Sequence, residues 1–142
     1  TVWTSDDDGA TWSSRFSTPT GDFITDLAAC PDGTVVFVGT HGLLRRLELD
    51  GGTTQLITTP SLRPPTSVSF GDGWCAPDGT VWTVSTRGLV HHISATGSSV
   101  TREPTGWGSR TNAAYSAPFI GGNSEAMFLF GDHAAVLARP LP

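Results

Sequence analysis

The chain has 142 residues, a length that suits a single domain. Charged residues make up only 15%, the net charge is −5 and every basic residue is arginine, so the acidic balance excludes binding to the phosphate backbone of nucleic acid. No run approaches the roughly 18 apolar residues of a membrane-spanning helix, whereas 37% hydrophobic residues are enough for a packed core.

Turn dipeptides punctuate the chain at short intervals: Asp8-Gly9, Asp32-Gly33, Asp50-Gly51 and Asp78-Gly79. The runs between them are rich in Val, Thr, Phe and Trp, and no long segment has a helical period. In chain order we expect two strands within 1–17, then 24–30, 34–39, 43–49 and 53–58, four more in the next unit, and about three within 112–141. The sequence predicts an all-β chain.

An internal repeat of 46 residues organises these strands. The segment Pro-Asp-Gly-Thr-Val at 31–35 recurs at 77–81, and the same offset pairs Val38 with Val84. A further step of 46 residues from Val84 leads to Phe130. The third unit has no Pro-Asp-Gly turn, and Asn123 lies at the corresponding place. Units of four strands and about 40–50 residues are typical of β-propeller blades. An irregular β-sandwich is the alternative.

The second strand of each unit favours the propeller. Residues 35–38, 81–84 and 127–130 are apolar or nearly so throughout, as expected for a strand that is buried on both faces between neighbouring blades. A sandwich strand with one solvated face would alternate instead. We therefore predict that the equivalent residues Val36, Trp82 and Phe128 are buried between blades.

The N-terminal segment carries a family resemblance. Residues 5–12, Ser-Asp-Asp-Asp-Gly-Ala-Thr-Trp, fit the pattern Ser-x-Asp-x-Gly-x-Thr-Trp. This resembles the Asp-box, or BNR repeat, of sialidases, sortilin-type receptors, photosystem assembly factors and many secreted or viral propellers. The resemblance implies a turn between the third and fourth strands of a blade, built by Ser5, Asp7, Gly9, Thr11 and Trp12. It also suggests an extracellular or virion-associated setting.

The blade count is incomplete. We expect the end of one blade in 1–20, a second blade in 21–62, a third in 63–108 and a partial fourth in 109–142. Propellers close with about four to eight blades. The sequence therefore indicates either part of a larger propeller or copies that associate to complete one.

The two cysteines offer a further prediction. Cys30 aligns with Ala76 and Cys75 aligns with Ala29, so the thiols lie one position apart in equivalent innermost strands. Successive strand residues point to opposite faces. On this basis we expect two unpaired, buried thiols.

Catalytic chemistry has little support. A sialidase needs an arginine triad, a tyrosine nucleophile with a glutamate, and an acidic proton donor, but the lone Tyr115 aligns with the apolar position of Phe23. Of the adjacent pairs Arg45-Arg46 and His91-His92, we expect one member each to point into solvent. We predict no catalytic residue, no cofactor and no metal, although the run Asp6-Asp7-Asp8 leaves a calcium site as an alternative.

Two classes of function remain. The first is a non-catalytic module that binds a protein partner or builds an assembly, including a viral or phage tail. The second is a glycan-binding, non-catalytic portion of a sialidase-like hydrolase, with Trp107 as the sugar platform. Turns between second and third strands and loops between blades share one face, rich in Arg and Trp. The predicted partner-binding residues on that face are His41, Arg63, Arg87, Trp107, Arg110, Asp132 and His133.

Overall fold

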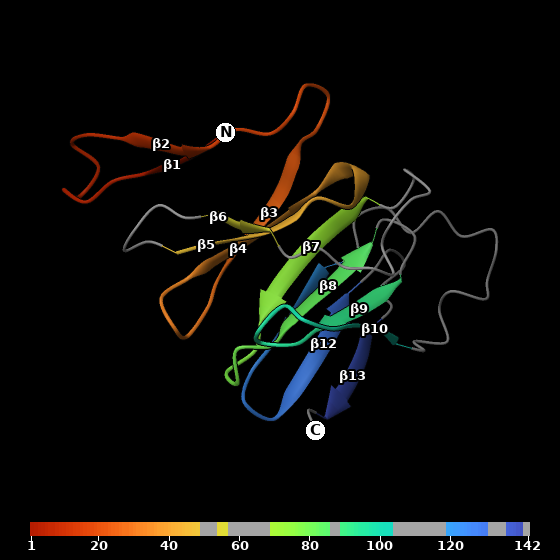
Figure 1. Ribbon diagram of the computed structural model, residues 1–142. Coiled ribbons are helices and arrows are strands. Elements are labelled where there is room, and N and C mark those ends of the chain that lie inside the picture. Colours follow the sequence, from red (N-terminus) through yellow and green to blue (C-terminus); the bar gives the residue numbers. More distant parts are fainter. Residues whose placement is uncertain (49–53, 57–68, 86–88, 104–118, 131–135, 141–142) are drawn as a thin grey trace.

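The computed structural model describes residues 1–48, 54–56, 69–85, 89–103, 119–130 and 136–140 (Figure 1). These residues form strands and one short 3-10 turn, η1 (Thr40–Gly42). The strands are β1 (Val2–Thr4), β2 (Ser13–Phe16), β3 (Ile24–Ala29), β4 (Val35–Gly39), β5 (Leu44–Leu47), β6 (Thr54–Leu56), β7 (Phe70–Cys75), β8 (Val81–Ser85), β9 (Val90–Ile93), β10 (Val100–Glu103), β11 (Phe119–Gly122), β12 (Ala126–Phe130) and β13 (Val136–Pro140). No described helix has the length and apolar character needed to cross a membrane.

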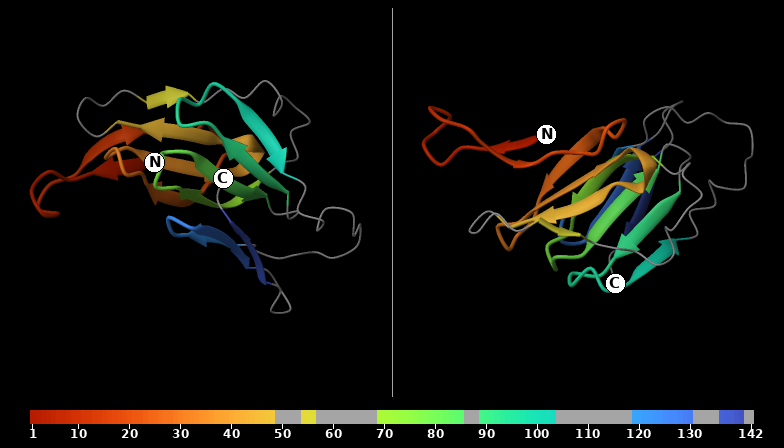
Figure 2. Two further views of the ribbon diagram at one scale, coloured as in Figure 1. Left: turned by 90° about the horizontal axis from the view of Figure 1, so that it is seen from below. Right: turned by 45° about the horizontal axis from the view of Figure 1, so that its top comes forward.

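The strands form four antiparallel sheets in sequence order. Blade 1 is β1-β2, blade 2 is β3-β4-β5-β6, blade 3 is β7-β8-β9-β10 and blade 4 is β11-β12-β13. Each strand pairs with its neighbour in the chain, so each sheet is a simple meander. Figure 2 shows blades 2, 3 and 4 lying beside one another in chain order, which is the arrangement of part of a β-propeller.

The apolar core lies between the sheets, because each blade packs on the next. One cluster joins Val36, Val38 and Leu44 of blade 2 to residues of blade 3, including Phe70 and Val81. Between blades 3 and 4 a second cluster includes Trp82, Val84, Ile120, Met127 and Leu129. A smaller cluster joins Val2 of blade 1 to Phe37 and Leu47 of blade 2.

The second strands behave largely as predicted. Val36 and Trp82 are almost completely buried, at 1% and 2% exposure. Phe128, however, is only half-buried, and Phe130 is exposed, whereas Met127 and Leu129 are buried. β12 alternates because blade 3 covers one of its faces and no described blade covers the other.

Glycine allows the closest approaches between blades. A Cβ atom on Gly73 would lie 3.3 Å from a methyl group of Val38, so blade 2 and blade 3 meet tightly at this point. A Cβ atom on Gly122 would lie 2.6 Å from the ring of Trp74, which leaves no room for any side chain there. These two interfaces therefore each pair an apolar side chain of one blade with a glycine on the innermost strand of the next blade.

We predict that Trp82→Ala lowers the free energy of unfolding by about 3–5 kcal/mol, since a fully buried indole leaves a cavity between two blades. Urea denaturation measures the loss. Trp3→Ala is the matched control, because Trp3 is 54% exposed, and it is expected to change stability by about 0.5 kcal/mol or less. A loss below about 1 kcal/mol for Trp82→Ala would contradict the core assignment.

Candidate functional site

His41 lies in the turn that joins β4 to β5. Its backbone is left-handed, with φ of +53°, and Gly42 follows with φ of +72°. The Thr40 amide donates to the Phe23 carbonyl (2.9 Å), and the Phe23 amide donates to Thr40 Oγ1 (2.8 Å). These two bonds hold the segment that enters blade 2 beside the β4–β5 turn, so both segments share one face of the blade.

The carboxylate of Asp22 lies on this face, next to His41. Its Oδ1 atom lies 2.6 Å from His41 Nδ1, and the Asp22 side chain is more buried than the imidazole. Burial lowers the pKa of the nearby Arg45 guanidinium, and the charge of Asp22 opposes that effect. The carboxylate therefore has an imidazole in direct contact and a guanidinium within electrostatic reach.

Phe23 supplies an apolar surface next to these groups. Its side chain is 67% exposed although its backbone is fixed by the two bonds to Thr40. An exposed aromatic ring on an anchored backbone can contact a partner at low entropic cost. Asp22, His41 and Phe23 together form what we term the turn-face cluster.

Of the predicted partner-binding residues, the structure describes only His41. The other six lie outside the described residues: Arg63, Arg87, Trp107, Arg110, Asp132 and His133. Sequence reasoning missed Asp22 and Phe23. The position of Asp22 just before an innermost strand was the available signal, because the preceding loop shares a face with His41.

The N-terminal turn lies at the opposite end of the strands, and its polar groups bind their own backbone. Ser5 Oγ accepts from the Gly9 amide (2.8 Å), and Asp7 accepts from the amide and the hydroxyl of Thr11 (2.8 and 2.6 Å). The Trp12 indole donates to the Gly9 carbonyl (3.0 Å), and Gly9 has φ of +90°. The bonds from Thr11 hold the pKa of Asp7 below its usual value. The carboxylate is thus occupied with turn structure.

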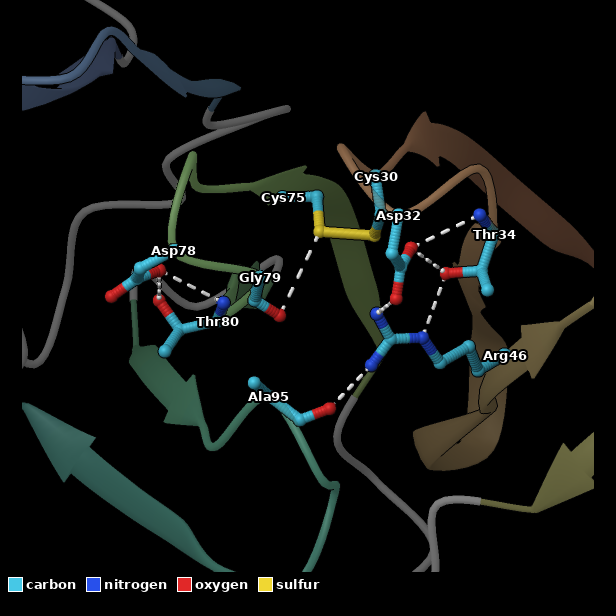
Figure 3. Close-up of a disulfide and its surroundings, with 9 residues drawn as sticks. All are labelled: Cys30, Asp32, Thr34, Arg46, Cys75, Asp78, Gly79, Thr80 and Ala95. Carbon is cyan, nitrogen blue, oxygen red and sulfur yellow. Dashed lines mark hydrogen bonds and ion pairs between the residues drawn. A yellow bond between two sulfur atoms is a disulfide. The ribbon is translucent and has the colours of Figure 1, made fainter.

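The cysteine prediction is wrong, because Cys30 and Cys75 form a disulfide between blades 2 and 3 with a Cα–Cα distance of 5.1 Å (Figure 3). Successive residues do point to opposite faces of a sheet. In stacked blades, however, opposite faces of neighbouring sheets face each other. A separation of 45 residues, one less than the repeat, therefore brings the two sulfur atoms together.

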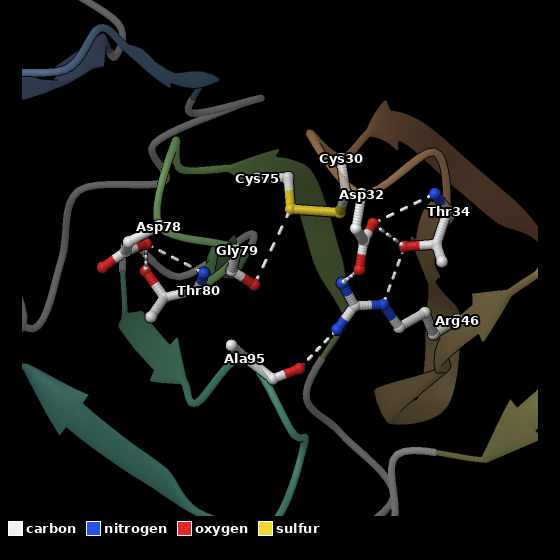
Figure 4. Close-up of polar contacts among 9 residues, drawn as sticks. All are labelled: Cys30, Asp32, Thr34, Arg46, Cys75, Asp78, Gly79, Thr80 and Ala95. Carbon is white, nitrogen blue, oxygen red and sulfur yellow. Dashed lines mark hydrogen bonds and ion pairs between the residues drawn. A yellow bond between two sulfur atoms is a disulfide. The ribbon is translucent and has the colours of Figure 1, made fainter.

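Arg46 reinforces the same interface (Figure 4). Its guanidinium donates to Asp32 Oδ2 (2.6 Å), to Thr34 Oγ1 (2.8 Å) and to the Ala95 carbonyl of blade 3 (2.5 Å). The two hydrogen bonds from Thr34, together with the charge of Arg46, keep the pKa of Asp32 below its usual value. Arg46 thus ties the first turn of blade 2 to blade 3.

The expectation that one residue of each basic pair points into solvent is also wrong. Arg46 is buried and Arg45 is half-buried, while His91 is buried and His92 stacks on Trp82 with ring centroids 4.2 Å apart. Both faces of a third strand are covered, so neither residue of a pair is fully solvated. Burial and the charge of Arg102 lower the pKa of His91.

A pair of equivalent aspartates crosses the blade 2–blade 3 interface near the centre. Asp26 Oδ2 and Asp72 Oδ1 both accept from the Gly73 amide (3.0 and 2.9 Å), and Asp72 Oδ2 accepts from the Ile120 amide of blade 4 (2.7 Å). Burial, followed by the interaction with Asp26, raises the pKa of Asp72 to about 6, although the two amides oppose the change. Each carboxylate therefore binds the innermost strand of the following blade.

The chain resembles two solved structures. It aligns over 99% of its length with 44% of a chain in "YCF48 bound to D1 peptide", with a TM-score of 0.69 and 16% identity. It aligns over 84% of its length with 44% of "KlHsv2 with loop 6CD replaced by a Gly-Ser linker", with a TM-score of 0.55 and 12% identity. At these identities the likeness shows the fold, and the chain spans less than half of either neighbour. No protein-family model and no curated protein matches the sequence.

Within the described residues, no three His, Cys, Asp or Glu side chains gather as a metal site would require. Polar groups gather at the N-terminal turn, in the turn-face cluster, in the aspartate pair and in the Arg46 network. Outside the turn-face cluster, these side chains bind the protein's own backbone. The turn-face cluster is therefore the described candidate for a ligand.

We predict that replacing both cysteines with alanine lowers the free energy of unfolding by about 2–4 kcal/mol, because the disulfide closes a long loop in the unfolded chain. Urea denaturation measures the loss, with and without dithiothreitol. The reductant should destabilise the native protein and leave the double variant unchanged. Two thiols that titrate in the unreduced, denatured protein would show that the bridge is absent.

We also predict a pH dependence from Asp72. The pKa of Asp72 is raised in the folded state, so between about pH 4 and 6 the carboxyl is protonated in the folded state and ionised in the unfolded state. The protonated carboxyl therefore stabilises the folded state at low pH, and this stabilisation is lost as the pH rises through about 6. After allowance for solvent screening we expect roughly 1 kcal/mol. The difference in unfolding free energy between the protein and Asp72→Asn, measured from pH 4 to 7, should carry this slope. A flat difference would contradict the assignment.

Proposed function

We propose that the chain is a non-catalytic propeller segment that binds a protein partner through the face carrying the turn-face cluster. The observation that carries the proposal is the 67% exposed Phe23 ring, held by two backbone bonds beside the Asp22–His41 pair. Aromatic residues next to charged groups on anchored loops are typical of interaction sites.

The charges of this site favour a peptide or protein ligand. Asp22 offers a carboxylate that a cationic side chain or an amide donor would contact, and the phenyl ring offers a surface for an apolar side chain. The solved neighbour YCF48 is bound to a peptide, the D1 peptide, which supports a peptide ligand for a propeller of this kind. On this proposal the six predicted residues outside the described part belong to loops of the same face.

The setting that this proposal favours is an assembly in which the propeller segment positions a partner. A viral or phage tail is one such assembly, and association of propeller segments with one another is another. The second candidate, glycan binding through Trp107, concerns a residue outside the described part. Glycan binding is tested as one of the possible results of the experiment below.

The test selects ligands and then maps their site. A phage-displayed library of random 12-residue peptides is selected on the immobilised protein, and selected peptides are titrated by fluorescence anisotropy. We expect His41→Ala combined with Phe23→Ala to weaken binding at least about tenfold, which corresponds to about 1.4 kcal/mol. Trp12→Ala is the matched control, because it removes an exposed aromatic ring from the opposite end.

Three outcomes would overturn the proposal. The first is unchanged peptide binding by the His41→Ala, Phe23→Ala variant with an unchanged thermal midpoint. The second is loss of binding in Trp12→Ala alone. The third is failure of the selection together with saturable binding on a glycan array, which would favour the sugar-binding alternative.

A further inference from the structure

The loop that enters blade 2 holds Asp22 and Phe23 in a fixed backbone conformation. The Asp22 amide donates to the Pro19 carbonyl (3.1 Å), and the Asp22 carbonyl accepts from Thr18 Oγ1 (2.9 Å). The Phe23 amide donates to Thr40 Oγ1 (2.8 Å), and the Phe23 carbonyl accepts from the Thr40 amide (2.9 Å). The main-chain polar groups of both residues are therefore occupied, and recognition of a ligand falls to their side chains.

The bond between Asp22 and His41 determines which polar atoms remain for a ligand. An ionised carboxylate only accepts hydrogen bonds, so the hydrogen between Asp22 Oδ1 and His41 Nδ1 (2.6 Å) belongs to the imidazole. The neutral imidazole then has its lone pair on Nε2. Within the described residues, neither Asp22 Oδ2 nor His41 Nε2 makes a hydrogen bond. The pair therefore offers a ligand two acceptors, one of them on a carboxylate.

His41 keeps a side chain at a position that favours glycine. Its φ is +53° and its ψ is +34°, in the left-handed region, where a Cβ atom costs free energy. Glycine would avoid this cost, so the conformation indicates a role for the imidazole itself. In the sequence, the equivalent positions of the next two units are Arg87 and His133. Each unit thus has a nitrogen-bearing side chain at this place in the repeat.

The charges around the pair favour a cationic ligand. The Asp22 side chain is 22% exposed, so its charge is screened less than that of a fully solvated carboxylate. Arg45 lies within electrostatic reach of Asp22, but its guanidinium donates to the Leu44 carbonyl (3.0 Å) and forms no ion pair with Asp22. The net charge of −5 attracts cations at longer range. The Phe23 ring beside the carboxylate can in addition stack on a cation.

We propose that the turn-face cluster recognises an arginine side chain of the partner peptide and that His41 makes this recognition dependent on pH. This step rests on the proposed function, because it takes the ligand to be a peptide. The guanidinium donates to Asp22 Oδ2 and to His41 Nε2, which a planar group with several N–H donors can do at once. Its planar face packs on the ring of Phe23.

Protonation of His41 opposes the binding of arginine. When the imidazole is neutral, the Asp22–His41 pair has one negative charge, and Nε2 accepts a hydrogen bond. When the imidazole is protonated, the pair is neutral, and Nε2 carries a hydrogen that repels the guanidinium. Imidazole changes charge between about pH 5 and 8, so the affinity for arginine rises with pH in this range. An anionic ligand would show the opposite pH dependence.

The other charged groups around this turn lie on β3, β5 and β7, whereas β4 has none. β5 contributes Arg45 and also Arg46, which is turned toward blade 3. β3 contributes Asp26, and β7, which packs on η1, contributes Asp72. Asp72 also gains negative charge as the pH rises through about 6, because its pKa is raised to about 6. The variant Asp72→Asn therefore has to be compared with changes at His41.

The probe is a pair of synthetic peptides, acetyl-Gly-Arg-Leu-Gly-amide and the same peptide with citrulline in place of arginine. Citrulline has the shape of arginine without its positive charge. Binding to the folded 142-residue protein is followed by ¹⁵N NMR through the backbone amide signals of Phe23 and His41, at pH 5.5 and at pH 8. Free L-arginine is titrated in parallel to separate a peptide ligand from a free amino acid.

We expect saturable shifts with the arginine peptide, and at least about tenfold weaker binding for the citrulline peptide and for Asp22→Asn. The protein should bind the arginine peptide at least about threefold more tightly at pH 8 than at pH 5.5. His41→Asn keeps a donor for Asp22, tolerates the left-handed backbone and does not titrate, so its affinity should be equal at the two pH values. Asp72→Asn should retain the pH dependence.

Any of four results overturns the proposal: no saturable shift with the arginine peptide, equal affinity for the citrulline peptide, a pH dependence that persists in His41→Asn, or tighter binding of free L-arginine than of the peptide. The library-selected peptides separate this proposal from the proposed function. If they bind at the turn-face cluster and the arginine peptide does not, the assignment of arginine alone is wrong. If neither binds there, the proposed function is wrong as well.

Discussion

The stacking of one blade on the next is the constraint on which the rest of this structure depends. A sheet of three or four short strands cannot bury enough apolar surface alone, so each blade needs a neighbour on both faces. Val38 against Gly73 and Trp74 against Gly122 show how closely the sheets approach. The buried second strands and the paired sulfurs both follow from this front-to-back contact.

Polar groups fix how the blades are aligned. Hydrophobic contact alone would tolerate sliding of one sheet past another, whereas the bond from the Gly73 amide to Asp26 and the bond from Arg46 to the Ala95 carbonyl each require a single register. These bonds lie at different places along the interface between blades 2 and 3, with the disulfide near Arg46 (Figures 3 and 4). Specific alignment keeps the turns of successive blades on common faces, where loops can act together.

The repeat made much of the fold predictable from the sequence. The expected strands 24–30, 34–39 and 43–49 correspond to β3, β4 and β5, and the burial of Val36 and Trp82 follows from the same pattern. Relations between sheets were harder to predict. The disulfide and the burial of Arg46 were missed because alternation was considered within one sheet and not across two facing sheets. Phe128 was predicted to be buried and is half-buried, because no described blade covers the outer face of β12.

The candidate site was predictable only in part. His41 was found because it recurs at the repeat spacing in a turn, whereas Asp22 and Phe23 have no such periodicity and become neighbours of His41 only through the bonds to Thr40. The aspartates at 26 and 72 did carry a signal, since they lie one repeat apart. Their role needed the structure, because each acts on the following blade and not on its own.

The disulfide also divides the molecule into parts of unequal cooperativity. The covalent bond between blades 2 and 3 lowers the entropy that either blade gains when it opens, so it couples these two blades more strongly than packing alone couples the other described neighbours. Blade 1 is held to blade 2 mainly through Val2 and Phe16. The backbone amide hydrogens of blade 1 should exchange with solvent through small local openings. The amide hydrogens of β4 and β8 should exchange only when blades 2 and 3 open together.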